Sequence, residues 1–234
     1  MRAFLLVAAA VALTACAGGR GDGVRMLPRD PRAAVLYVAL GDSTVEGVGA
    51  SAPAATYVAR LHARLRTVYP RAAVINLGLG GATSADVEGD QLDRAILLRP
   101  QLVTVSVGPN DVTEHVPVAE YERNMDTILR RLTAETPAVV VVNLLPDIAV
   151  TPRYRGREGA PELDRRTVEF NVALRRRVRE LGAELVDLYA PSKAELPIRP
   201  ELVGPDGYHP SDAGYARWAE LLWTGVQRRI ERGE

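Results

Sequence analysis

From residue 33 onward the chain alternates between short apolar runs and segments with helical periodicity, and this alternation restricts the folds it can adopt. The apolar runs are rich in β-branched residues and cover 35–40, 73–77, 102–107, 139–145 and 185–188. They are continuous rather than alternating with polar residues, which is typical of strands buried on both faces of a sheet. Because helical segments separate the runs, the pattern predicts an α/β fold whose parallel sheet carries helices on both faces.

The segments between the runs repeat apolar residues at three- and four-residue spacing. This spacing predicts helices in 57–68, 118–132 and 211–230, each with one face toward the sheet. Ser84 and Ser211 are expected to cap the helices that follow them. In parallel sheets of this kind, ligands bind beyond the carboxyl ends of the strands, so functional side chains are expected just after each run.

The N-terminus differs from the rest of the chain and indicates export. An apolar stretch over 4–13 follows a basic start and is too short to span a bilayer, as in a secretory signal. Residues 13–16, Leu-Thr-Ala-Cys, resemble the lipobox of bacterial lipoproteins, which implies a signal peptide over 1–15 and a lipid on Cys16. The predicted location is therefore the cell envelope, anchored to a membrane. Ordinary signal cleavage after Ala17, giving a secreted soluble protein, is the alternative.

Composition separates a tether from one folded domain. Residues 16–32 are rich in Gly, Arg, Pro and Asp and are predicted to form a flexible tether before a domain over 33–234. The chain has 234 residues and a net charge of +0, which argues against nucleic acid as a partner. The basic run 175–177 is interpreted as a solvated helix face. Cys16 is the single cysteine, so no intramolecular disulfide is possible.

The first apolar run ends in Gly41-Asp42-Ser43, which places a serine between a strand and a helix. A serine hydroxyl becomes a nucleophile when a base takes its proton. Taken alone, the segment is better explained as a common turn with a helix cap. It is not the Gly-x-Ser-x-Gly elbow of α/β-hydrolases, because Val45 stands at the position of the second glycine.

A carboxylate and an imidazole lie three positions apart near the C-terminus, in Asp206-Gly207-Tyr208-His209-Pro210. In an irregular turn of this kind, Asp206 can accept a hydrogen bond from Nδ1 of His209 and leave Nε2 for a serine. For this segment alone, a helix-entry loop with an ordinary, hydrogen-bonded histidine is the better explanation.

Two loops after later runs could supply hydrogen-bond donors to a developing oxyanion. Residues 76–81 contain three glycines, which let backbone N–H groups approach a ligand closely. Residues 108–111, Gly-Pro-Asn-Asp, offer the side-chain amide of Asn110. Turn chemistry at strand ends explains either loop alone.

In this order, the four segments resemble the motif blocks of the SGNH (GDSL-type) hydrolase family, over roughly residues 35–222. The resemblance implies a three-layer α/β/α sandwich with a central, mostly parallel, five-stranded sheet of flavodoxin-like type. It implies Ser43 as nucleophile, His209 as base and Asp206 as the residue that orients it. The implied oxyanion hole comprises the N–H groups of Ser43 and Gly81 and the side chain of Asn110. No metal or cofactor is implied. Thr44 and Pro109 depart from the usual pattern without removing a reacting group.

The expected reaction is hydrolysis of a carboxylic ester or thioester through an acyl enzyme on Ser43. An esterase or lysophospholipase is favoured, and a polysaccharide O-deacetylase or an O-acyltransferase stays open. A non-catalytic envelope binding protein is the least favoured alternative. Candidate substrates are therefore a small acyl ester, a lipid or an acylated glycan. Oligomeric state is left open.

Five further residues are expected to line the substrate cleft. These are Asp42 and Thr44 beside Ser43, His115 after the third run, and Asp147 and Tyr154 after the fourth. The long segment 147–161 follows a strand and could cover the cleft. Its arginines could meet an anionic head group such as that of a lysophospholipid, although a solvated loop explains them equally well.

Overall fold

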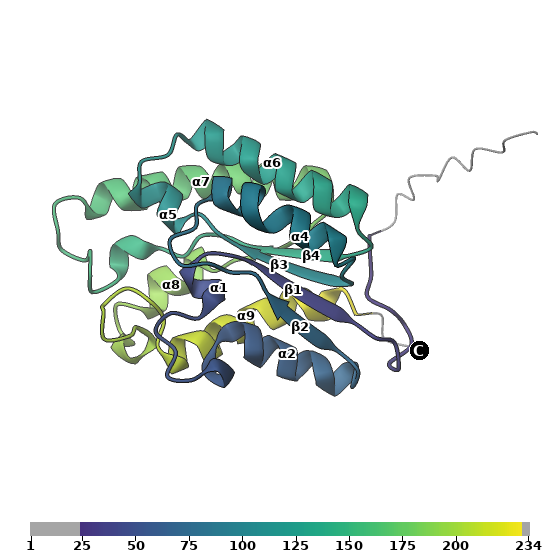
Figure 1. Cartoon of the computed structure of the whole chain (residues 1–234). Helices are drawn as coiled ribbons and strands as arrows, with labels where there is room; N and C mark the ends of the chain where they lie inside the picture. Colours follow the sequence, from purple (N-terminus) through teal and green to yellow (C-terminus); the bar gives the residue numbers. More distant parts are fainter. Residues whose placement is uncertain (1–23, 231–234) are drawn as a thin grey trace, which may run out of the picture.

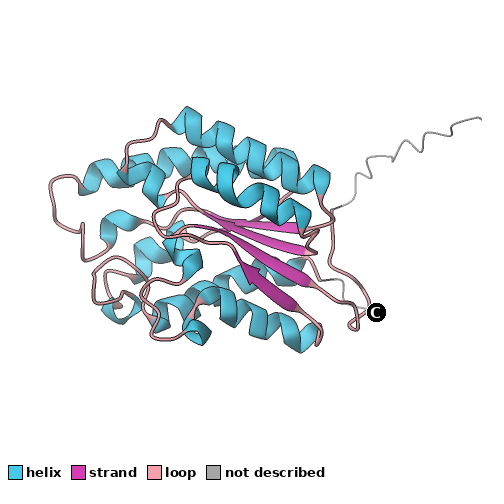
Figure 2. Cartoon of the chain, in the orientation of Figure 1, coloured by secondary structure: helices cyan, strands magenta, loops and turns pink. Residues whose placement is uncertain are grey.

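The computed structural model describes residues 24–230 as a five-stranded sheet between two layers of helices (Figures 1 and 2). The strands are β1 (Leu36–Gly41), β2 (Ala73–Asn76), β3 (Leu102–Ser106), β4 (Val139–Asn143) and β5 (Glu184–Val186). All neighbouring strands are parallel, in the order β2-β1-β3-β4-β5. This is the flavodoxin-like order, in which the strand sequence reverses direction between β1 and β3. The predicted fold class is confirmed.

The two faces of the sheet are covered by different helices. The longer helices are α2 (Tyr57–Val68), α4 (Leu92–Leu97), α6 (Val118–Glu135), α7 (Ala160–Leu181), α8 (Tyr189–Glu195) and α9 (Asp212–Arg228). The short ones are α1 (Ser43–Glu46), α3 (Ser84–Asp86), α5 (Pro109–Thr113), η1 (Pro53–Ala55), the π-helical η2 (Val87–Gln91), η3 (Ile148–Val150) and η4 (Pro200–Leu202). Helices α4, α6 and α7 cover one face and α2 and α9 the other, with an apolar cluster under each layer (Figure 1). The three helices predicted from periodicity correspond to α2, α6 and α9.

Burial differs between central and edge strands. Every residue of β3 and β4 is buried, as is all of β1 except its first residue. In β2, by contrast, Ala73 and Asn76 are exposed, and β5 is only partly buried. The prediction that all five runs are buried on both faces is therefore wrong for the edge strands, because each has a neighbouring strand on one side alone.

Helix capping follows the sequence signals with one shift. Ser211 caps α9 as predicted, and its Oγ accepts a hydrogen bond from Gly214 N at 3.2 Å. At α3, however, the cap is Thr83, which forms a reciprocal capping box with Asp86. Ser84 is the first helical residue, and its hydroxyl is thereby free to bond elsewhere.

The described part of the predicted tether packs against the domain. Leu27 is 2% exposed, and its N–H donates to Arg229 O at 2.7 Å. The guanidinium of Arg25 donates to Thr136 O and Ala138 O, so it satisfies carbonyl groups just past the end of α6. The prediction of a flexible tether is wrong for residues 24–32, since composition does not reveal these distant acceptors. The predicted signal peptide, Cys16 and the rest of the tether lie outside the described residues.

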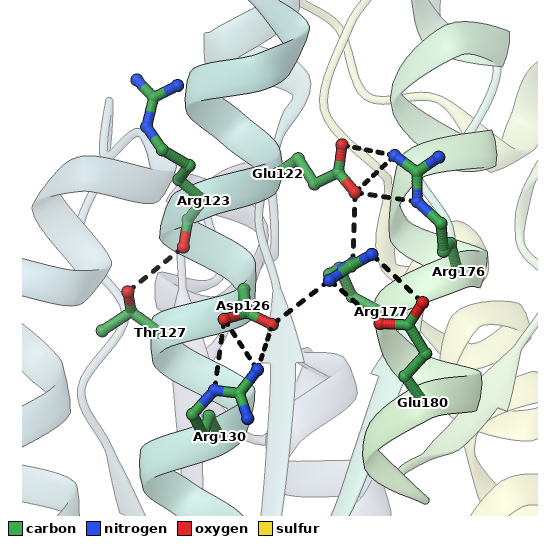
Figure 3. A network of polar contacts seen from close by, with 8 residues as sticks. All are labelled: Glu122, Arg123, Asp126, Thr127, Arg130, Arg176, Arg177 and Glu180. Atoms are coloured by element: carbon green, nitrogen blue, oxygen red, sulfur yellow. Dashed lines mark hydrogen bonds and ion pairs between the residues drawn. The ribbon is translucent and has the colours of Figure 1, made fainter.

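Charged side chains join α6 to α7 on the outer surface (Figure 3). Arg177 of α7 forms ion pairs with Glu122 at 3.1 Å and Asp126 at 3.5 Å, both on α6. Arg176 also pairs with Glu122, and Arg175 pairs with Asp187 at 3.1 Å. The basic run 175–177 therefore has carboxylate partners from other segments.

No helix within residues 24–230 is both long and apolar enough to cross a membrane.

Candidate active site

Ser43 is held at the junction of β1 and α1 by the backbone of Gly41. Gly41 has φ +146°, and a Cβ there would lie 1.9 Å from Ser106 O on β3, so only glycine fits. The side chain of buried Gln91 accepts from Gly41 N–H and donates to Gly41 C=O, both at 2.8 Å. The strand end that precedes the serine is thus fixed on two sides.

Asp42 caps the helix that Ser43 begins. Its Oδ1 accepts from Thr44 N at 2.9 Å and from Thr44 Oγ1 at 2.7 Å. The side chain is 1% exposed, and burial raises the pKa of Asp42 to about 6 in spite of these hydrogen bonds. Asp42 therefore organises the turn around Ser43.

His209 links Ser43 to Asp206. Nε2 of His209 lies 3.0 Å from Oγ of Ser43, and Nδ1 lies 2.5 Å from Oδ2 of Asp206. With a proton on Nδ1 donated to the carboxylate, Nε2 is left to accept the serine proton. Partial burial acts to raise the pKa of Asp206, but the hydrogen bonds from His209 and from backbone amides outweigh it and lower that pKa. Asp206 is thus ionised when the imidazole needs a counter-charge.

The loop that carries His209 is rigidly hydrogen-bonded. Oδ1 of Asp206 accepts from the amides of Tyr208 and His209 at 2.9 and 3.0 Å. Gly204 N donates to His209 O at 2.7 Å, and Gly207 turns the chain with φ +73°. The predicted pairing of Asp206 with His209 therefore depends on a local turn. The contact of His209 with Ser43, by contrast, joins residues far apart in the sequence.

Donors for an oxyanion surround Ser43. Its own N–H lies at the first position of α1, where no preceding turn supplies an acceptor. Within residues 24–230 the N–H of Gly81 donates to no other group, and this glycine has φ +80°. Asn110 uses one amide hydrogen for Ala82 O at 2.9 Å and keeps the other. Because Ala82 follows Gly81 directly, this bond holds the Asn110 side chain close to the Gly81 N–H.

A buried carboxylate behind these donors ties their two loops together. Asp111 is 0% exposed and accepts from Ser84 N at 2.9 Å and from Ser84 Oγ at 2.5 Å. Asn124 of α6 donates to the same hydroxyl at 3.0 Å. Burial raises the pKa of Asp111 to about 6, with the bonds from Ser84 acting against it. Asp111 thus couples the Asn110 helix to the start of α3, three residues after Gly81.

An apolar cavity opens at Ser43 and extends along α8 and α9. Its volume is about 100 Å³. Besides Ser43 and His209, its lining includes apolar side chains from several elements: Pro146, Ile148, Leu188, Leu196, Leu202, Val203, Trp218 and Leu221. The ion pair between Glu195 and Arg217 also contributes to the wall. Such a mostly apolar cleft with a few placed polar groups is typical of a small-molecule site.

The structure places two of the five expected cleft residues at this cavity, Asp42 and Thr44. Asp147 instead turns inward, where it caps η3 and lies 3.4 Å from Lys193 Nζ. Tyr154 packs edge-on against Tyr208, and His115 is an exposed residue beyond α5 with φ +59°. The expectation of cleft-lining roles is therefore wrong for these three. The loop after β4 still reaches the cavity, through other residues.

The sequence did not reveal Gln91 and Ser84 as positioning residues, and it assigned no role to Asp111. Gln91 lies in the π-helical turn η2, an element that often occurs at functional sites. No periodicity or motif distinguishes it from a surface glutamine.

No cluster of three or more His, Cys, Asp or Glu side chains in the described range is arranged to hold a metal ion. The arrangement is suited to acyl transfer by an activated serine.

Comparisons with known proteins agree with this geometry. Residues 39–217 match the model of the GDSL-like lipase/acylhydrolase family. The chain is 30% identical over 191 residues to an acetylxylan esterase of Geobacillus stearothermophilus, covering 75% of this chain and 83% of that protein. It is 29% identical over 213 residues to a GDSL-like esterase of Mycobacterium tuberculosis, covering 89% and 67% of the two chains.

Solved structures show the same fold. LAE5, an α/β hydrolase from the metagenome of Lake Arreo, Spain, superposes with a TM-score of 0.68 at 23% identity, over 86% of this chain and 100% of that one. TesA superposes with a TM-score of 0.67 at 23% identity, over 85% and 100% of the two chains.

Proposed function

The chain belongs to the GDSL-like lipase/acylhydrolase family and is a serine ester hydrolase, and from this premise we propose that it releases apolar acyl chains from their esters. The observation that carries the proposal is the hydrogen-bonded series Asp206–His209–Ser43 at the opening of an apolar cavity. We assign Ser43 as nucleophile, His209 as general base and acid, and Asp206 as the residue that orients and stabilises the imidazole.

In the first half-reaction, Oγ of Ser43 attacks the ester carbonyl carbon while Nε2 of His209 takes its proton across the 3.0 Å contact. The carbonyl oxygen becomes an oxyanion that accepts from the N–H groups of Ser43 and Gly81 and from the side chain of Asn110. When the carbon–oxygen bond to the alcohol breaks, the imidazolium returns its proton to the leaving alkoxide.

In the second half-reaction, water attacks the acyl-Ser43 ester and His209 takes a proton from it. The oxyanion occupies the same donors. Collapse of this intermediate releases the carboxylic acid, and the proton on Nε2 returns to Oγ of Ser43. A thioester follows the same steps with a thiolate as the leaving group.

The cavity supports an acyl chain longer than acetyl. Gly214 and Leu221 of α9 both line it, and seven residues of helix correspond to about 10 Å. Leu188, Leu196 and Trp218 complete an apolar wall along this length. Burying each methylene of a chain against such a wall contributes about 0.8 kcal/mol. We therefore propose a medium-length aliphatic acyl chain as the occupant.

A series of p-nitrophenyl esters from acetate to dodecanoate tests this proposal. We expect kcat/KM to rise with acyl length and then fall once the chain exceeds the cavity. Leu221→Phe shortens the cavity and should move the optimum to shorter chains, whereas Leu97→Phe, at a residue that is 82% exposed, serves as the matched control. Ser43→Ala should abolish turnover and labelling by a fluorophosphonate. Full activity of Ser43→Ala, or an optimum at acetate, would contradict the assignment.

Deacetylation of a glycan is the second candidate, because an acetylxylan esterase is 30% identical to this chain. Acetate release from acetylated xylooligosaccharides, compared with release of octanoate from an octanoyl ester, decides between the two. A kcat/KM for the acetylated sugar above that for the octanoyl ester favours the deacetylase.

We also propose that Cys16 carries a lipid that anchors the protein in the cell envelope, from its place in the sequence 13–16. Residues 24–35 enter the fold at the amino end of β1, and Ser43 lies beyond its carboxyl end (Figure 1). An anchor at Cys16 therefore holds the end of the sheet remote from the catalytic site. Incorporation of radiolabelled fatty acid by the wild type but not by Cys16→Ser tests the anchor, and equal labelling would contradict it.

A further inference from the structure

Arg153 is attached to the loop that carries His209. Its N–H donates to Gly207 O at 2.9 Å, and Gly207 lies between Asp206 and His209 in the sequence. Thr151, two residues earlier, lines the apolar cavity, as does Tyr208. The backbone of Arg153 therefore lies next to both the catalytic loop and the cavity.

The guanidinium of Arg153 is held over aromatic rings. Its Cζ lies 5.4 Å from the centre of the Tyr208 ring and 5.8 Å from that of Tyr154. Tyr208 in turn packs edge-on against His209, with ring centres 5.0 Å apart. Tyr208 therefore lies against both the guanidinium of Arg153 and the imidazole of His209.

The hydrogen-bond donors of this guanidinium have no acceptor among the residues that the structure describes. Within residues 24–230, no carboxylate or carbonyl oxygen accepts from the Arg153 side chain, which is exposed. Arg155, in the same loop, donates to Pro197 O at 3.2 Å, and Arg176 and Arg177 have carboxylate partners (Figure 3). Stacking on a ring engages the face of a guanidinium and leaves its N–H groups, which lie in the plane, available to a ligand.

The mechanism determines which part of the substrate lies there. His209 must return its proton to the leaving alkoxide, so the alcohol part of the ester lies beside the imidazole when the bond breaks. The acyl chain occupies the apolar cavity, and the alcohol part stays outside it. Arg153, one aromatic ring away from His209, is therefore placed to contact this alcohol part.

We propose that Arg153 is a specificity-determining residue that binds an anionic group on the alcohol part of the ester. The preferred substrates are then esters of an apolar acid with an alcohol that carries a phosphate or carboxylate group, both of which a guanidinium binds through paired hydrogen bonds. This inference rests on the proposed function, since it takes the acyl chain to lie in the cavity.

Three esters of octanoic acid with different alcohol parts test the proposal: 1-octanoylglycerol, 1-octanoylglycerol 3-phosphate and octanoyloxyacetate. For each enzyme, the measured quantity is kcat/KM for each anionic ester divided by kcat/KM for the neutral one. We expect Arg153→Gln to lower this ratio about three- to tenfold for at least one anionic ester, because an exposed charge-assisted contact is lost. The arm with the larger loss identifies the anionic group.

Arg157→Gln is the matched control, since Arg157 lies in the same loop and has no ring contact with Tyr208. It should keep the wild-type ratio. Added salt should lower the ratio of the wild type but not that of Arg153→Gln. An unchanged ratio in Arg153→Gln, or an equal fall in Arg157→Gln, would overturn the proposal. Failure of the wild type to hydrolyse even the neutral octanoyl ester would instead contradict the proposed function.

Discussion

Replacing Ser84 by alanine should impair catalysis without touching a reacting group. The hydroxyl of Ser84 donates to Asp111 at 2.5 Å and accepts from Asn124 at 3.0 Å. The first bond involves a carboxylate and is buried, whereas the second is neutral and partly buried. Losing such a pair costs about 2 to 4 kcal/mol of the free energy of unfolding.

The effect on rate comes from the coupling of two oxyanion loops. Asp111 follows Asn110 directly, and Ser84 follows Gly81 by three residues, so the bond between them holds both donors in one geometry. A displacement of about 1 Å at a catalytic group can lower a rate up to about 100-fold. Because Ser84→Ala keeps the bond from its own N–H, we expect kcat to fall about tenfold and KM to stay within about twofold.

Thr136→Val provides a matched control for the loss of stability. Thr136 is 5% exposed, and its hydroxyl also makes two bonds, to Leu132 O at 2.6 Å and with Ala138 N at 3.1 Å. It lies before β4, at the end of the sheet opposite Ser43. Urea unfolding gives the stability of each variant, and hydrolysis of p-nitrophenyl octanoate gives kcat and KM. If Ser84→Ala is destabilised as much as Thr136→Val and both keep full kcat, the coupling argument is refuted.

Three further results are expected. Asp206→Asn should lower kcat by a factor of about 100 to 10,000, because the imidazolium loses its counter-charge, and should slow fluorophosphonate labelling in parallel; normal labelling would contradict this role. Leu27→Ala should lower the free energy of unfolding by about 2 to 5 kcal/mol and leave kcat unchanged, as measured by urea unfolding; no loss would mean that the N-terminal segment contributes little. Asp42 and Asp111 have raised pKa values of about 6, so the folded state binds their protons more tightly than the unfolded chain does. Their contribution to stability is therefore largest below about pH 4 and is lost as pH rises through about 6, by up to about 3 kcal/mol each. The free energy of unfolding of Asp111→Asn should therefore fall less than that of the wild type between about pH 4 and about pH 7, as measured by urea unfolding at each pH.

Local features of the chain predicted most of the elements. Continuous β-branched runs located the five strands, and apolar spacing located α2, α6 and α9, because both depend on residues close in sequence. The pairing of Asp206 with His209 was equally accessible, since three residues of irregular turn bring them together. The tether was mispredicted over 24–32 because Leu27 and Arg25 are held by groups far along the chain.

The sequence by itself determined the layered α/β architecture and pointed to the candidate reacting groups, because strand burial, helix periodicity and motif order are all present along the chain. The tertiary structure alone decided which side chains stand around them. Gln91 holds Gly41 from 50 residues away, and Ser84 reaches Asp111 across 27 residues. The apolar cavity combines the loop after β4 with α8 and α9, and Arg153 becomes significant only because folding places it over Tyr208. Contacts of this kind depend on the relative position of segments distant in sequence, and periodicity and local propensity carry no information about that position.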